Sequence, residues 1–440
     1  MFRSLKVRNF RIFTTGQLVK LIGVWAQFIA QDWLVLQLSN NSATALGFVS
    51  ALQFLPVLLL TLYGGRLADR YDKRKLLIAV NGAFALSTLV LGGLVITGSV
   101  ALWQVFGFAA VTGIVNSVET PVRQSFVSEL VSLDLLPNAL SLSAATFNSA
   151  RIIGPAIAGV AIGWFNVGPV FLADSVLCTA PLFARIRLRP EDLLRRDPAI
   201  AATRDARIID GLRYVWRRED LLTPILLVLV LGMFGFNFPV NLAILAKTVF
   251  HAQASTFGLL STALAVGALA GALASTGRRS RPSGVIVIVA GVAFGAFEVI
   301  VGFAPTFLTA AILLVPTGFF MIYFAQAANQ RVQLGTESAY RGRVMALYVL
   351  VFLGTTPIGA PVTGWCAENL GPRFGMWIGG GVSCAASLVV AAYHVRRSRL
   401  QTRAEDPAAA GTAVSVTKAV AGTTAPQAKR TVPVEDPVAA

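Results

Sequence analysis

The chain is short of charge. Only 13% of its 440 residues are charged, whereas soluble globular proteins carry about 25%. Hydrophobic residues make up 55% of the chain, and the mean hydropathy is +0.69. This composition excludes a water-soluble enzyme, and we expect no enzymatic activity.

Residues that bind metals are also scarce. The three cysteines, Cys178, Cys366 and Cys384, form no CxxC pair, and the two histidines, His251 and His394, are isolated. A disulfide framework and a zinc site are therefore not expected. The absence of a GxxxxGK[ST] motif excludes ATP binding by a phosphate-binding loop of that type. We predict that the protein uses no cofactor.

Long apolar runs fill the chain instead. A helix needs about 20 mostly apolar residues to cross a bilayer. The first run, from Phe10 to Leu38, is about twice as long as a signal-peptide core and predicts an uncleaved membrane helix. Further runs cover 44–64, 76–97, 101–121, 139–164, 168–187, 221–246, 254–276, 284–303, 305–327, 343–367 and 373–395. The sequence thus predicts an all-α membrane protein with twelve transmembrane helices in two pseudo-symmetric six-helix bundles.

The charged segments divide the chain into four predicted parts. These are a first bundle at 1–188, a cytosolic linker at 189–220, a second bundle at 221–396 and a disordered cytosolic tail at 397–440. Within the linker, Ile208, Leu212 and Val215 fall on one helical face close to several arginines. This pattern predicts a short helix, which either lies on the membrane surface or is an ordinary linker helix.

The net charge of +16 is distributed unevenly. The two termini, the linker and alternate connectors hold 33 of the 37 Lys and Arg residues, while the intervening connectors hold only Lys247 and Arg373. Because cytoplasmic loops are enriched in Lys and Arg, we expect both termini in the cytoplasm and the protein in the inner (plasma) membrane. The charge therefore indicates orientation in a lipid bilayer and not binding to nucleic acid.

The two predicted bundles repeat each other. GRLAD from Gly65 recurs as GALAS from Gly271, and IGPAIAG from Ile153 recurs as IGAPVTG from Ile358. The two pairs have nearly the same separation and fall at equivalent helices. Internal repeats of this kind are typical of secondary transporters.

One connector carries a specific motif. The stretch GRLADRYDKR at 65–74 resembles the signature between helices 2 and 3 of the major facilitator superfamily. Asp72 stands where the general pattern has glycine, which is similar to the branch that includes the enterobactin exporter and macrolide-efflux proteins. QDWLVLQL at 31–38 and segments within 119–159 resemble the same branch. The resemblance implies alternating access, contacts between the halves through helices 2, 5, 8 and 11, and export driven by proton exchange.

The resemblance also implies an ionic latch on the cytosolic side. In the family, the aspartate of this connector braces the start of helix 11, and the basic residues reach an acid on helix 4. The corresponding residues here are Gly65, Asp69, Arg70, Lys73 and Arg74, with Glu119 as the acid. We hypothesise that these pairs close the cytosolic side of the outward-facing state. The alternative is that the cations serve only to orient the connector.

Two groups of residues are candidates for the wall of a substrate cavity. Polar side chains on one face of the first helix are disfavoured against lipid tails, and adaptable aromatic walls suit lipophilic ligands. Buried helix contacts are the alternative for the polar group, and lipid-facing packing is the alternative for the aromatic stretches. The candidates are Gln17, Lys20, Gln27 and Gln31 in the first helix, and Phe236, Asn237 and Tyr323 in the aromatic stretches.

Ionisable residues inside the membrane are candidates for proton coupling, because retained charges there are usually paired or functional. Asp32 is the first candidate, and a structural acid near the outer interface is its alternative. Arg151, which keeps its proton, would tune a carboxylate, bind an anionic substrate or form a structural pair. Glu298 is a further candidate, although it and Asp174 lie on expected scaffold helices where a structural role is favoured.

Small residues in the fifth helix predict a close, sliding helix interface. Gly154, Pro155 and Gly159 match the antiporter signature G-P-x-x-G in part. The sequence as a whole predicts a monomeric secondary transporter that couples protons to the export of amphipathic small molecules, such as drugs, antibiotics or siderophore-like metabolites. The alternatives are an importer of a small metabolite and a non-transporting receptor or assembly factor on the same fold.

Overall fold

The computed structural model describes residues 3–132, 134–189, 208–276, 280–337 and 340–405. Within these residues, twelve helical spans are long and apolar enough to cross a membrane, which confirms the predicted number. The first six crossings are α1 (Arg8–Leu38), α2 (Ala43–Arg70), α3 (Lys73–Ile96), α4 (Leu102–Leu130), α5 (Leu136–Phe165) and a divided helix made of α6 (Val167–Leu177) and α7 (Ala180–Ile186).

The second half begins after the linker. Its crossings are α9 (Glu219–Phe234) with α10 (Phe238–Ile244) and the π-helix η4 (Leu245–Val249), then α11 (Ala254–Thr276), α12 (Gly284–Gly302), α13 (Phe307–Gly335), α14 (Arg341–Gly354) with α15 (Thr356–Asn369), and α16 (Phe374–Glu405). The last helix continues to Glu405, beyond the predicted start of a disordered tail at 397. The reason is that no proline or glycine occurs between residue 397 and Pro407. The rest of the predicted tail lies outside the described residues.

Local sequence explains where several helices begin and divide. The side chain of Asp72 accepts a hydrogen bond from the Lys75 backbone N–H at 3.0 Å and caps α3. The residue that departs from the general motif is therefore a helix cap. The breaks within the sixth, seventh and eleventh crossings are each followed by a proline, Pro181, Pro239 and Pro357. Proline is tolerated in the first turn of a helix because that turn needs no N–H donor.

The linker contains α8 (Ile208–Trp216), so the predicted short helix is present. Its Val215 side chain is buried, and Gly211 lies against Arg343 at the start of α14. Leu212 and Trp216 are exposed. One face of α8 thus packs on the second half, while the other remains open.

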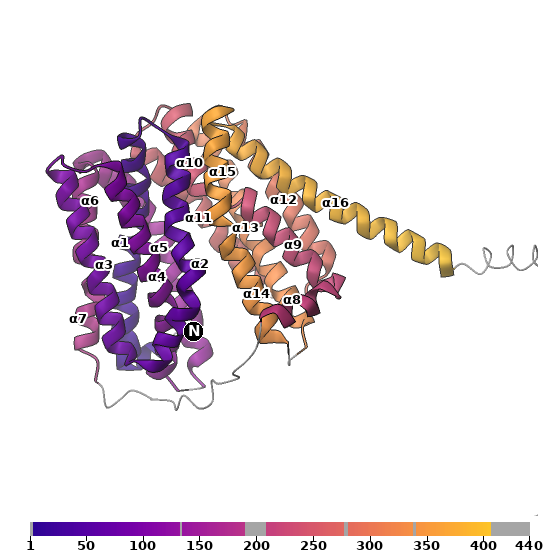
Figure 1. The fold of residues 1–440 in the computed structure, drawn as a ribbon, viewed down its shortest axis with the longest axis horizontal. Helices are drawn as coiled ribbons and strands as arrows, with labels where there is room; N and C mark the ends of the chain where they lie inside the picture. The colour runs from indigo at the N-terminus through magenta and orange to yellow at the C-terminus, as the bar shows by residue number, and fades with distance from the viewer. Residues whose placement is uncertain (1–2, 133, 190–207, 277–279, 338–339, 406–440) are drawn as a thin grey trace, which may run out of the picture. The chain divides into compact units, whose positions relative to one another are not determined.

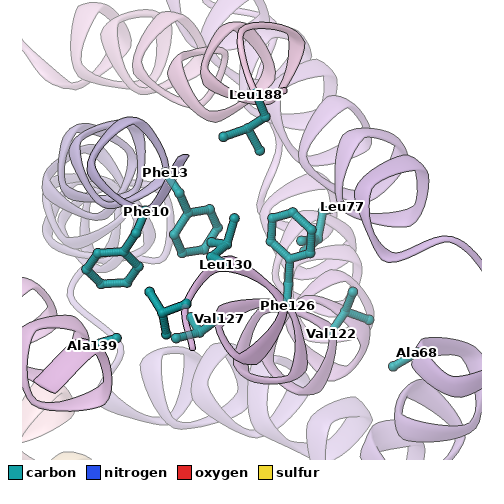
Figure 2. Packing of buried hydrophobic residues seen from close by; sticks show 11 residues of the cluster. Phe10, Phe13, Ala68, Leu77, Val122, Phe126, Val127, Leu130, Ala139 and Leu188 are labelled. Carbon is teal, nitrogen blue, oxygen red and sulfur yellow. The ribbon is translucent and has the colours of Figure 1, made fainter. Parts of the chain in front are cut away.

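An apolar cluster of the first half lies near the N-terminus of α1 (Figure 2). Phe13 of α1 meets Phe126 of α4 edge to face, with ring centroids 5.6 Å apart. Leu77 of α3 is also fully buried in this cluster. Burial of such side chains stabilises a fold by about 1.5–3 kcal/mol each, so the first half has an apolar core of its own.

The two halves meet through α2 with α15 and through α5 with α11 (Figure 1). These are the second, eleventh, fifth and eighth crossings, as the family resemblance implied. We call the helix ends that carry the N-terminus and the α2–α3 turn the basic end, and the opposite ends the distal end. At the distal end, glycines bring backbones together: Gly364 lies against Ala43, and Gly159 lies against Ser255.

Contacts between the halves stop near the middle of the helices. Among the described residues, the hydrogen bonds and glycine contacts that join the halves extend from the distal end only as far as Leu58 with Gly354 and Ile152 with Thr262. Toward the basic end, α2 and α14 diverge (Figure 1). Among the described residues, the hydrogen bonds and glycine contacts that join the halves therefore lie between the distal end and the middle of the helices.

Candidate functional site

A cavity of about 350 Å³ lies between the two halves. Most of its wall is apolar, and aromatic rings come from both halves. The aromatic lining residues are Trp25, Phe28, Phe54, Phe236, Phe238, Phe257 and Phe352. A concave, mostly apolar space with a few polar groups is the usual form of a small-molecule site.

Asp32 and Arg151 are the two charged side chains among the described residues that line this cavity. Asp32 lies on α1 and is 8% exposed. No hydrogen-bond or ion-pair partner of its carboxyl group occurs among the described residues. A carboxyl group in a low-dielectric space without a partner is available to bind a proton or a cationic group.

Arg151 lies on α5, and its guanidinium group sits over the Trp25 ring at 5.6 Å from the centroid. Among the described residues, no carboxylate lies within 4 Å of it. A Cβ atom on Gly154 would lie 2.5 Å from the Trp25 Cβ, so this glycine allows α5 to approach α1. Asp32 and Arg151 therefore face one cavity without forming an ion pair.

The polar stripe of α1 lies elsewhere. Gln17, Lys20, Gln27 and Gln31 are all buried, and none of them is among the described residues that line the cavity. Lys20 pairs with Glu119 of α4 at 3.2 Å, and Gln27 donates to Gln31 at 2.9 Å. The structure therefore places the stripe inside the first half, where the Gln17 amide group has no hydrogen-bond partner among the described residues, while Trp25, Phe28 and Asp32 line the cavity.

Lys73, one residue of the expected latch, pairs with an acid of α4 other than Glu119. Lys73 pairs with Glu129 at the basic end of α4, whereas Glu119 pairs with Lys20 and with Arg123. Glu119 lies ten residues before Glu129 and so about 15 Å further along the helix, beyond the reach of a side chain in the α2–α3 turn. Among the described residues, the acid of α4 that Lys73 reaches is therefore Glu129, and the role of either acid in a latch stays a prediction.

The other described residues of the expected latch make few contacts. A Cβ atom on Gly65 would meet no atom within 4 Å. Arg70 is exposed and lies over the ring of Tyr71, and Arg74 is partly exposed. Asp69 is in the last turn of α2, and its side chain lies outside the described part of the chain.

The small residues of α5 serve two different contacts. Gly154 packs against α1, as described above. Pro155 and Gly159 face α11, where a Cβ atom on Gly258 would collide with the Pro155 carbonyl oxygen. Pro155 also lines the cavity. Pro155 and Gly159 thus lie at the interface between the halves, and Gly154 does not.

The remaining candidates also differ in whether they line the cavity. Phe236 lines the cavity. Asn237 is buried and donates to Thr363 of α15 at 3.0 Å. Tyr323 stacks on Phe319 at 5.5 Å on α13 and is not among the described residues of the cavity wall. Glu298 is fully buried on α12, away from the cavity.

One polar contact between the halves was not predicted. Glu368, at the distal end of α15, accepts hydrogen bonds from the Ser42 hydroxyl and the Thr44 backbone N–H, each at 2.8 Å. Ser42 is the N-cap of α2. The sequence signal for this contact was an acid near the end of one interface helix and a serine just before the other.

Known proteins with similar sequences are membrane transporters. Residues 1–422 match the family described as transmembrane secretion effector. The staphyloferrin A transporter of Staphylococcus aureus is 29% identical over 267 residues, which cover 59% of this chain and 64% of that transporter. The multidrug efflux pump Tap of Mycolicibacterium fortuitum is 25% identical over 352 residues, or 78% of this chain and 85% of the pump. The match to the staphyloferrin A transporter thus spans slightly less than two thirds of its length.

A solved structure shows the same fold. The nucleoside transporter NupG superposes with a TM-score of 0.70 at 10% sequence identity, over 87% of this chain and 98% of NupG. The predicted fold of two six-helix bundles is therefore confirmed.

Proposed function

The chain belongs to the transmembrane secretion effector family of the major facilitator superfamily, and from this we propose that it exports amphipathic small molecules in exchange for protons. Proteins of this family are transporters and not enzymes. The relatives include a multidrug efflux pump and a staphyloferrin A transporter. The name of the efflux pump supports export of small molecules.

The observation that carries the proposal is the aromatic cavity faced by Asp32 and Arg151, neither of which forms an ion pair with a described residue. Aromatic and apolar walls bind the body of an amphipathic molecule. The two charged groups bind its polar end and set the charge balance of the cavity. When Asp32 is ionised it offsets Arg151, and when Asp32 is protonated the cavity carries a net positive charge.

This charge balance links the proton to the substrate. A cationic or hydrogen-bond-donating group needs the ionised Asp32, so it competes with the proton. Competition at one carboxylate moves substrate and proton in opposite directions, because each occupies the site only when the other has left. Arg151 retains its charge throughout and favours release of the proton when the substrate arrives.

The position of the contacts between the halves supports export, because they lie on the side of the distal end. The basic end carries most of the Lys and Arg residues, which we assign to the cytoplasmic side together with both termini. The cavity of this state is then reached from the cytoplasm, where an exporter takes up its cargo. Release on the other side requires the distal contacts to open and the basic end to close.

Ethidium efflux tests the proposal. Cells expressing the protein are loaded with ethidium, and the decline of fluorescence is followed with and without a protonophore. We expect efflux that stops when the proton gradient collapses and that persists when ATP is depleted at a maintained gradient. Efflux that depends on ATP alone, or faster ethidium entry in expressing cells, would contradict proton-coupled export. Asp32→Asn is expected to abolish the proton-dependent component.

A further inference from the structure

Glu298 on α12 has an unusual environment. Its side chain is 0% exposed, and neither carboxyl oxygen has a hydrogen-bond partner among the described residues. No described Lys or Arg forms an ion pair with it. An ionised carboxylate without a partner is strongly disfavoured in such a site, so the neutral, protonated form fits these surroundings.

Two glycines make room for the carboxyl group. A Cβ atom on Gly235 would lie 3.1 Å from Glu298 Oε2, and a Cβ atom on Gly379 would lie 2.8 Å from Oε1. Gly235 belongs to the break between α9 and α10, and Gly379 belongs to α16. The carboxyl group is therefore packed between the break in the seventh crossing and the last helix.

The neighbouring elements bring no described counter-charge to this site. On α16, the Ser383 hydroxyl donates to the Gly379 carbonyl oxygen at 2.7 Å. Cys384, a titratable residue of the same helix, has its backbone against Gly295 of α12. On the break, the side chains next to Gly235 are Phe234 and Phe236. These surroundings favour the neutral, protonated form of the Glu298 carboxyl group over the ionised form.

The break connects this carboxyl group to the cavity. Phe236 lines the cavity, and its ring meets Phe294 edge to face at 5.4 Å. Phe294 lies one turn before Glu298 on α12. A substrate that displaces Phe236 therefore acts on the same short segment that covers the Glu298 carboxyl group.

The break also connects to the contact between the halves. Asn237 donates to the Met233 carbonyl oxygen at 2.8 Å and to the Thr363 hydroxyl of α15 at 3.0 Å. The next residue of α15, Gly364, lies against Ala43 of α2 at the distal end. Movement of residues 235–237 is thus mechanically linked to the interface that closes the cavity.

We infer that Glu298 is a second proton-binding site, outside the substrate cavity, that couples proton binding to the position of the break at 235–237. The inference rests on the proposed proton-coupled export. In the state described here, the proton forms the O–H bond of the carboxyl group. When the break moves and water reaches the carboxyl group, that bond breaks and the proton passes to water, which leaves the ionised carboxylate.

Infrared spectroscopy of the purified full-length protein tests the proton directly. At neutral pH, the wild type is expected to show the C=O stretching band of a protonated carboxylic acid that is missing from Glu298→Gln. If the two spectra agree in this region, Glu298 is ionised and the inference is wrong. Gly235→Ala keeps the carboxyl group and should shift the frequency of the same band, so the test does not depend on the folding of Glu298→Gln alone.

Proton counting in proteoliposomes tests the coupling. Ethidium transport and the internal pH are followed together, and Glu298→Gln is expected to move at least one proton fewer per ethidium than the wild type while still exchanging ethidium. Asp174→Asn, which alters another buried acid, is the matched control and should keep the wild-type ratio. An unchanged ratio in Glu298→Gln overturns the inference. A wild type that moves ethidium without protons contradicts the proposed function instead, and the infrared result still decides whether Glu298 holds a proton.

Discussion

Glu368 of α15 caps α2 of the other half by accepting a hydrogen bond from the Thr44 backbone N–H at 2.8 Å. The first turn of a helix has free N–H donors and a partial positive charge, and both favour a carboxylate there. This arrangement is the counterpart, at the distal end, of the latch expected between Asp69 and the start of α14 at the basic end.

Removal of this cap should shift the protein toward the state that opens at the distal end. Glu368 is exposed, so its hydrogen bonds contribute at most about 1 kcal/mol, or about fivefold in the equilibrium between states. We expect Glu368→Ala to increase, by a few-fold, the rate at which an impermeant maleimide reaches a cysteine placed at Ser261 in the cavity from outside the cell. Glu337→Ala, at the basic end, should leave this rate unchanged or lower. Equal labelling in Glu368→Ala and the wild type would show that the cap does not stabilise the closed end.

Gly364→Ala tests the close contact at the same interface by steric means. The new Cβ atom would collide with the Ala43 carbonyl oxygen, and such overpacking costs about 1–3 kcal/mol. We expect the variant to favour the state that is open at the distal end. Ethidium should therefore bind less to the detergent-solubilised variant than to the wild type. The matched control is Gly82→Ala, because a Cβ atom there meets nothing within 4 Å. Similar binding by both variants would contradict the predicted role.

Asp32 and Arg151 should act on transport together. Since both line one cavity, the effects of Asp32→Asn and Arg151→Gln on proton-driven ethidium efflux are expected to be non-additive by at least about 0.5 kcal/mol. Asp32→Asn alone should remove proton dependence and weaken the binding of cationic ethidium, because the amide carries no negative charge, whereas Asp32→Glu should retain both. Simple additivity in the double-mutant cycle would show that the two groups work independently.

Phe126 tests the apolar core of the first half (Figure 2). Truncation of a buried phenylalanine removes its apolar contacts and leaves a cavity, which typically costs about 3–5 kcal/mol. Phe126→Ala should therefore lower the thermal unfolding temperature of the detergent-solubilised protein clearly. Trp103→Ala, at a ring that is 71% exposed, should change this temperature little. A small effect at Phe126 would mean that this cluster is not a stabilising core.

The sequence alone determined the class of the protein and the number of its crossings. Apolar runs of sufficient length must become helices in a bilayer, because every backbone polar group needs a partner there. The motif at 65–74 and the repeated segments identified the superfamily. The sequence also proposed Asp32 and Arg151 as functional residues, since ionisable residues are rare in membrane helices, and the structure places both at the cavity wall.

Only the tertiary structure decided which neighbour each side chain meets. Periodicity placed Gln17, Lys20, Gln27 and Gln31 on one face of α1, but it did not show that Lys20 on this face pairs with Glu119 of α4. The choice of Glu129 over Glu119 as the partner of Lys73 depended on depth along α4, and the caps formed by Glu368 depended on contact between helices more than 300 residues apart. Local sequence fixes the direction of a side chain on its own helix, whereas the packing of the helices fixes what lies opposite.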